Sequence, residues 1–158
     1  MVFFFFPSNT CKKDNEFSEV PYAYVDIELN TINELSVIGV GQFILIRPSA
    51  TYGQIVLYDP YQNVTYPPIG GKFTGKGIIL YHYGPDEWHA YDNTCTYLPQ
   101  TDNAEVTIHK DSLYAVCPKC KSRFFLLDGS PAAGSVAPRP LKQYHTLIDE
   151  YGNLLITN

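Results

Sequence analysis

Three of the four cysteines lie in two short segments whose spacing is typical of ligands that share a metal centre. Cys95 opens the segment Cys95-Thr96-Tyr97, and 22 residues later Cys117 and Cys120 enclose two further residues. A C-x-x-C pair can turn two thiolates toward one ion or cluster, and a second segment supplies the remaining ligands. The same pair forms a redox disulfide in other proteins, usually at the start of a helix in a β-α-β unit, which this sequence does not predict. The cysteines therefore indicate a metal or cluster site.

The histidines are weaker candidates. A zinc knuckle would need a fourth ligand, and neither His89 nor His109 has the local spacing to supply it. His82 and His89 stand among aromatic residues of predicted strands, so we expect them to be hydrogen-bonded sheet residues, and we expect His145 at the surface. The acidic pairs 86–87 and 149–150 stand at turns, and there is no nucleophile motif or phosphate-binding glycine loop. The sequence therefore predicts no catalytic activity of its own.

The cysteine segments must be positioned by strands, because no convincing amphipathic helix longer than two turns is found. Thirteen Tyr, twelve Pro and eleven Gly favour short strands joined by turns. Gly39 and Gly41 predict a bulge or bend in one of them. Two tight hairpins are expected around residues 110–112 and 151–153. The predicted strands are 22–29, 37–46, 54–59, 77–83, 87–92, 105–109, 113–116, 122–127, 144–149 and 154–157.

The residues that follow the cysteines resemble a known family. Val116-Cys117-Pro118 and Ser122-Arg123-Phe124 frame the second segment, the turn Asp128-Gly129-Ser130 comes next, and a proline-rich stretch occupies 137–141. From about residue 88 to 158 the chain resembles the Rieske domain, whose two loops, C-x-H and C-x-x-H, hold a [2Fe–2S] cluster. The resemblance implies an all-β fold, an antiparallel β-sandwich or barrel with a small cluster-binding subdomain. It also implies a one-electron carrier that serves a redox partner, which the sequence does not identify.

The sequence departs from the family at the ligands. In Rieske domains the two cysteines bind one iron and the two histidines bind the other. Cys95 and Cys117 match the cysteine positions, whereas Tyr97 and Cys120 stand where the histidines belong. Lys121 replaces the glycine that usually follows the second histidine. The fold is therefore implied more directly than the cluster.

Three outcomes remain open at this site. A [2Fe–2S] cluster could be held by Cys95, Cys117, Cys120 and the Tyr97 phenolate. Its potential would then shift from the Rieske range, roughly −150 to +300 mV, toward the ferredoxin value near about −400 mV. Alternatively, zinc could bind the three thiolates and one more donor. In the third outcome two cysteines form a disulfide or the site is empty, and the chain is a binding or structural protein.

Size and charge narrow the function further. At 158 residues, with 45% hydrophobic and 17% charged residues, the chain has the material for one packed domain and is not disordered. The net charge of −5 and the lack of a large basic cluster argue against a nucleic-acid partner. No apolar run approaches the ~20 residues of a membrane-spanning helix.

The N-terminus predicts export. A run of apolar residues at 2–6 is followed by Pro7 and, at position 11, by a cysteine. This resembles the end of a bacterial lipoprotein signal, in which Cys11 becomes the lipidated residue. We therefore expect residues 1–20 to be a signal and tether, and 21–158 to form a single Rieske-like domain with its cluster-type loops within 92–140. The protein would be exported and lipid-anchored to a bacterial membrane.

Overall fold

The computed structural model describes residues 19–66, 68–108 and 112–158, and its regular elements are all β-strands. Strands occupy two antiparallel sheets, and the described ranges include no helix long and apolar enough to cross a membrane. The chain is therefore all-β, as predicted. The strands are β1 (Val25–Asn30), β2 (Phe43–Pro48), β3 (Gln54–Tyr58), β4 (Ile69–Gly70), β5 (Lys72–Phe73), β6 (Ile78–Gly84), β7 (Glu87–Asp92), β8 (Thr107–Ile108), β9 (Tyr114–Val116), β10 (Arg123–Phe125), β11 (Gln143–Ile148) and β12 (Asn153–Thr157).

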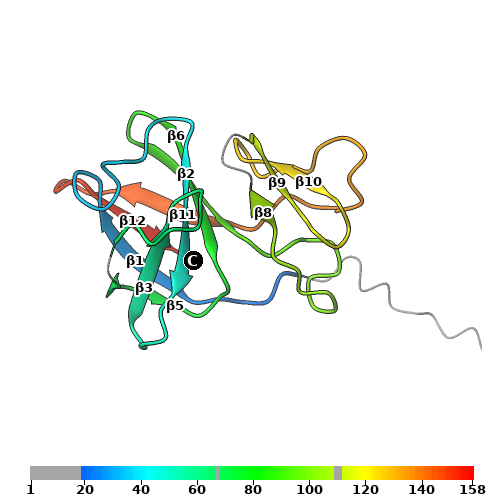
Figure 1. The fold of residues 1–158 in the computed structure, drawn as a ribbon, viewed down its shortest axis with the longest axis horizontal. Helices are drawn as coiled ribbons and strands as arrows, with labels where there is room; N and C mark the ends of the chain where they lie inside the picture. Colours follow the sequence, from blue (N-terminus) through cyan, green and yellow to red (C-terminus); the bar gives the residue numbers. More distant parts are fainter. Residues whose placement is uncertain (1–18, 67, 109–111) are drawn as a thin grey trace, which may run out of the picture.

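The larger sheet has nine strands in the order β4-β3-β2-β6-β7-β11-β12-β1-β5. It curls into a nearly closed barrel (Figure 1), and Gly71, between β4 and β5, donates a backbone hydrogen bond to Gly53 beside β3 at 3.0 Å. The smaller sheet consists of β10, β9 and β8 in that order, and lies beside the barrel in Figure 1. It is built from the chain between β7 and β11, so both of its ends are anchored in neighbouring barrel strands.

Two hydrophobic cores share the same barrel strands. Alternate residues of β2 and β6, among them Ile44 and Leu80, point into the barrel core. The residues between them, among them Leu45 and Ile79, belong to a second core together with Phe124 of the small sheet. Because successive side chains of a strand face opposite ways, one apolar run can supply both cores. This explains why β2 and β6 are buried on both faces, whereas β1 alternates between buried and exposed residues.

Several predicted strands agree with the structure. The strand 87–92 coincides with β7, 54–59 is one residue longer than β3, and 77–83 is displaced by one residue from β6. The pairing of β11 with β12 confirms the last hairpin. The pairing of β8 with β9 confirms the first, although part of its turn lies outside the described residues.

Other boundaries were wrong. The predicted strand 37–46 begins only at Phe43, because Gly41 has a φ of +84° and Val37 and Val40 are exposed in turns. The first strand begins at Val25 rather than Tyr22. The strand predicted at 105–109 is reduced to β8, since Glu105 forms only an isolated bridge with Thr94. The two-residue strands β4 and β5 were not predicted, because neither is long enough to show an alternating pattern.

Candidate metal centre

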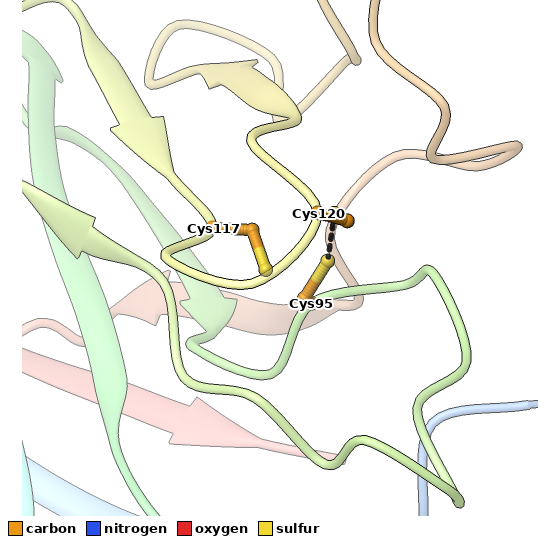
Figure 2. A group of neighbouring side chains, drawn as sticks. All are labelled: Cys95, Cys117 and Cys120. Atoms are coloured by element: carbon orange, nitrogen blue, oxygen red, sulfur yellow. Dashed lines mark hydrogen bonds between the residues drawn. The ribbon is translucent and has the colours of Figure 1, made fainter.

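The three predicted cysteine ligands meet between two loops. Cys95 lies on the loop that leaves β7, and Cys117 and Cys120 lie on the turn between β9 and β10. Their Sγ atoms all lie within 4.8 Å of one another, and Cys95 Sγ is 3.6 Å from Cys120 Sγ. Figure 2 shows the Cys95 side chain pointing from its own loop toward Cys120 on the other. Cys95 and Cys117 are buried, whereas Cys120 is half-buried and is the part of the group nearest to solvent.

The first loop is held by a buried carboxylate at the end of β7. Asp92 Oδ1 accepts a hydrogen bond from Thr94 N at 2.8 Å, and its Oδ2 accepts one from the Tyr144 hydroxyl at 2.6 Å. Cys95 N donates to Ala104 O at 2.8 Å, which closes the loop on itself. Asp92 and Tyr144 are only 2% and 3% exposed, so this support is shielded from water.

The second loop is a tight turn. Cys117 N donates to Ser122 O at 2.8 Å, and Lys121 N donates to Cys117 O at 3.0 Å. The buried Ser122 hydroxyl accepts a hydrogen bond from Ala137 N at 3.0 Å and lies 3.2 Å from Cys120 Sγ. Ser122 therefore connects the thiol of Cys120 to the proline-rich segment 137–141.

Backbone strain is concentrated around the same loops. Leu98 and Asn103 follow Cys95, Lys121 follows Cys120, and all three have positive φ, +48°, +46° and +63° respectively. Elsewhere in the described ranges only Gln62 and Asp86 share this conformation among non-glycine residues. Such conformations cost on the order of 1 kcal/mol or more and are often retained at functional sites. Three residues of these loops therefore adopt a backbone conformation that non-glycine residues seldom take.

The three thiols differ in acidity. Burial raises the pKa of the Cys95 thiol well above its ordinary value. Burial also acts to raise the pKa of Cys120, but hydrogen bonds from the Ser122 hydroxyl and amide, together with those to Cys117 and Cys95, hold it below its ordinary value. Cys120 is therefore the thiol that ionises more readily of these two and can first provide a thiolate.

The donor set fits a thiophilic metal centre. Thiolates bind zinc, copper(I) and iron–sulfur clusters. Within the described ranges, no histidine, carboxylate or further cysteine joins the three sulfur atoms. Tyr97 is half-buried and packs against the second core beside the cysteines, and its role as a ligand stays a prediction.

The three described histidines, His82, His89 and His145, do not join the cysteine group. His82 Nδ1 is 2.8 Å from Ile38 O, and its ring stacks on Trp88 at 3.9 Å. His89 Nδ1 is 2.7 Å from Leu127 O. His145 is exposed on β11, and His109 lies outside the described residues.

Sequence reasoning did not identify the supports of the site. Asp92 could have been suggested by the Asp-Asn-Thr segment, since an aspartate often accepts a hydrogen bond from the amide two residues later. Ser122 follows Cys120 by two residues and was used only as part of a family frame. Tyr144 lies 52 residues from Asp92, and nothing in the sequence connects them.

Comparison with known proteins gives matches of overall shape alone. No family model matches the chain, and no curated protein matches it. Among solved structures, the ferredoxin of carbazole 1,9a-dioxygenase from Nocardioides aromaticivorans IC177 is 24% identical, with a TM-score of 0.36 over 54% of this chain and 79% of that one. A complex of reduced oxygenase and oxidized ferredoxin in carbazole 1,9a-dioxygenase matches with 15% identity and a TM-score of 0.43, over 77% of this chain and 85% of that one. At these scores neither match establishes what this chain binds or does.

Proposed function

We propose that this chain is a Rieske-type one-electron carrier in which Cys95, Cys117 and Cys120 hold an iron–sulfur centre. The observation that carries the proposal is the convergence of three thiol sulfurs within 4.8 Å from two separate loops. The strained residues on both loops support it, because a bound centre would hold the backbone in that shape. The Tyr97 phenolate is the proposed fourth ligand of a [2Fe–2S] cluster.

The three cysteines would then have different roles in electron transfer. A [2Fe–2S] centre supplies reversible one-electron transfer when bound. Cys95 and Cys117, 0% and 1% exposed, keep water from the inner side of the site. Cys120 is half-buried, so electrons would enter and leave through its side of the loop.

The charges around the site set the expected potential. Anionic thiolate and phenolate ligands in place of neutral imidazoles stabilise the oxidised iron, which lowers the potential toward the ferredoxin value of about −400 mV. The Ser122 hydroxyl accepts a hydrogen bond from the Cys120 thiol at 3.2 Å. Toward a metal-bound thiolate the same hydroxyl would donate, and this would raise the potential because it withdraws charge from the sulfur. The cations Lys119 and Lys121 on the same turn act in the same direction.

Cysteine variants test the proposal. The protein is produced with intact iron–sulfur assembly and purified without oxygen, and its visible spectrum and iron content are compared among variants. Cys120→Ser should lose the charge-transfer absorption, whereas Cys11→Ser removes a cysteine outside the site and should keep it. Equal spectra for the two variants would exclude Cys120 as a ligand.

A single zinc ion is the second candidate. The 3.6 Å between Cys95 Sγ and Cys120 Sγ is close to the spacing of about 3.8 Å expected for two thiolates on one tetrahedral zinc. This candidate predicts zinc without acid-labile sulfide in the purified protein.

A disulfide is the third alternative for the same cysteines. In the structure Cys95, Cys117 and Cys120 are free thiols. Cys95 and Cys120 would need to shorten their 3.6 Å separation to about 2.05 Å. Intact mass would then show the loss of two hydrogens, and the chain would be a binding or structural protein.

We also propose that Cys11 carries a lipid and holds the exported protein at a bacterial membrane. Support comes from the apolar run 2–6 and the cysteine that follows it, both outside the described residues. Detergent partitioning of the full chain tests this, since wild type should enter the detergent phase and Cys11→Ser should not.

A further inference from the structure

We propose that the surface around Cys120 is a docking site for an acidic protein, with Lys121 as its main contact. This inference rests on the proposed function, because it specifies the partner that would exchange electrons with the centre. It concerns residues 117–123, which form the turn between β9 and β10 together with the first residue of β10.

The turn is positively charged on a negatively charged protein. The whole chain has a net charge of −5, but residues 117–123 include Lys119, Lys121 and Arg123 and no acidic residue. All three cations are exposed. Lys119 forms an ion pair with Asp102, whose Oδ1 is 3.8 Å from Lys119 Nζ. Within the described ranges Lys121 and Arg123 form no ion pair, although the Arg123 guanidinium lies over the Tyr114 ring, 5.3 Å from its centroid. No carboxylate neutralises the two charges, so both can attract an acidic partner.

Lys121 keeps its charge in an unfavourable backbone conformation. Its φ of +63° is a conformation that glycine adopts freely and lysine does not. The side chain is exposed, so it gains no burial in exchange. Its Nζ donates to Pro118 O at 2.6 Å, which holds the ammonium group over the turn that carries Cys117 and Cys120. The turn therefore presents an exposed cation next to Cys120 at a position where glycine would be less strained.

Charge complementarity then selects the partner. The negative remainder of the protein repels an acidic partner, whereas the turn attracts it within the Debye length of about 10 Å. An acidic surface would therefore approach with Cys120 facing it, and such steering can raise association rates by roughly tenfold or more. A basic partner would be drawn to the other faces, away from the thiols.

The first test uses isotope-labelled full chain without added metal, titrated with poly-L-glutamate and followed by amide NMR shifts. Shifts should concentrate at residues 117–123, saturate at low salt and disappear at high salt. Lys121→Gly should weaken this binding several-fold while raising thermal stability, because it relieves the backbone strain. The matched control Lys72→Gln, an exposed cation on β5, should leave binding unchanged.

Three results would overturn the docking site. The first is amide shifts spread over other faces of the protein, and the second is an equal effect of Lys121→Gly and Lys72→Gln on polyglutamate binding. The third is binding of residues 117–123 to anionic phosphatidylglycerol vesicles but not to polyglutamate. The last would assign the surface to a membrane instead.

The second test uses iron-loaded protein and separates this inference from the proposed function. Oxidation by the anion ferricyanide should become faster as salt is lowered, despite the net charge of −5. Slower oxidation at low salt would exclude the docking site and leave the electron carrier intact. Polyglutamate binding at the turn by a protein that takes up no iron would exclude the electron carrier and leave the docking site intact.

Discussion

The barrel and the small sheet differ in the length of their strands and in the residues of their cores. The barrel core consists of aliphatic and aromatic side chains from strands that pair along most of their length. The small sheet has strands of only two or three residues, and two of the cysteines belong to the core between it and the barrel. The small sheet therefore shares its core with β2 and β6, whereas the barrel has a core of its own. We therefore expect the barrel to provide most of the folding stability, and the cysteines beside the small sheet to provide the metal site.

The largest expected effect is the loss of metal on changing Cys117 in the small region. Cys117→Ser replaces a buried sulfur by a harder and shorter oxygen donor, which should abolish metal retention while the barrel stays folded. Metal analysis together with far-UV circular dichroism checks both parts. Cys11→Ser is the control. Full metal content in Cys117→Ser would show that Cys117 is not a ligand, and would contradict the assignment of the metal site to the small region.

The next largest effect belongs to the barrel. Ile46 is 0% exposed on β2 and points into the barrel core. Ile46→Ala should lower the free energy of unfolding by about 3 kcal/mol, through lost burial and a cavity. Urea denaturation measures this, and metal stoichiometry should equal that of wild type below the transition. A lowered metal content in the folded variant would show that the regions are not separable.

A smaller effect is expected where the two regions meet. Tyr144→Phe removes the hydroxyl that donates to the buried Asp92 carboxylate, at a cost of about 2 kcal/mol. Because Asp92 also holds the loop of Cys95, this variant should reduce both stability and metal affinity. Competition with a chelator measures the affinity. If Tyr144→Phe lowers stability and leaves metal affinity unchanged, Tyr144 supports the barrel and not the metal site.

Features that depend on residues close together in the sequence could be predicted, whereas features that depend on tertiary contacts could not. Alternating and apolar residues predicted β3, β6 and β7 nearly to the residue, since these patterns are local. The spacing of Cys117 and Cys120 predicted that they would share a site. The Asp92–Tyr144 hydrogen bond and the positive φ of Leu98 depend on tertiary packing, which no local pattern records.

The smallest effect concerns the acidity of Cys120. Its pKa is held down in part by the Ser122 hydroxyl, so Ser122→Ala should move it upward. In metal-free reduced protein, alkylation of Cys120 by iodoacetamide should then begin at higher pH than in wild type. Cys95, whose pKa is raised by burial, should stay unreactive in both proteins.

The control for this profile is Ser36→Ala, which changes an exposed serine on a turn outside the site. It should reproduce the wild-type profile. An unchanged profile in Ser122→Ala would show that the hydroxyl does not stabilise the thiolate.

The central claim is that the three thiols hold an iron–sulfur centre, and the iron and acid-labile sulfide content of wild-type protein tests it most directly. The protein is purified without oxygen from cells with intact cluster assembly. The proposal predicts about two irons and about two sulfides per chain, with visible absorption that dithionite bleaches. A protein without iron, carrying either one zinc without sulfide or a disulfide between Cys95 and Cys120, would contradict it.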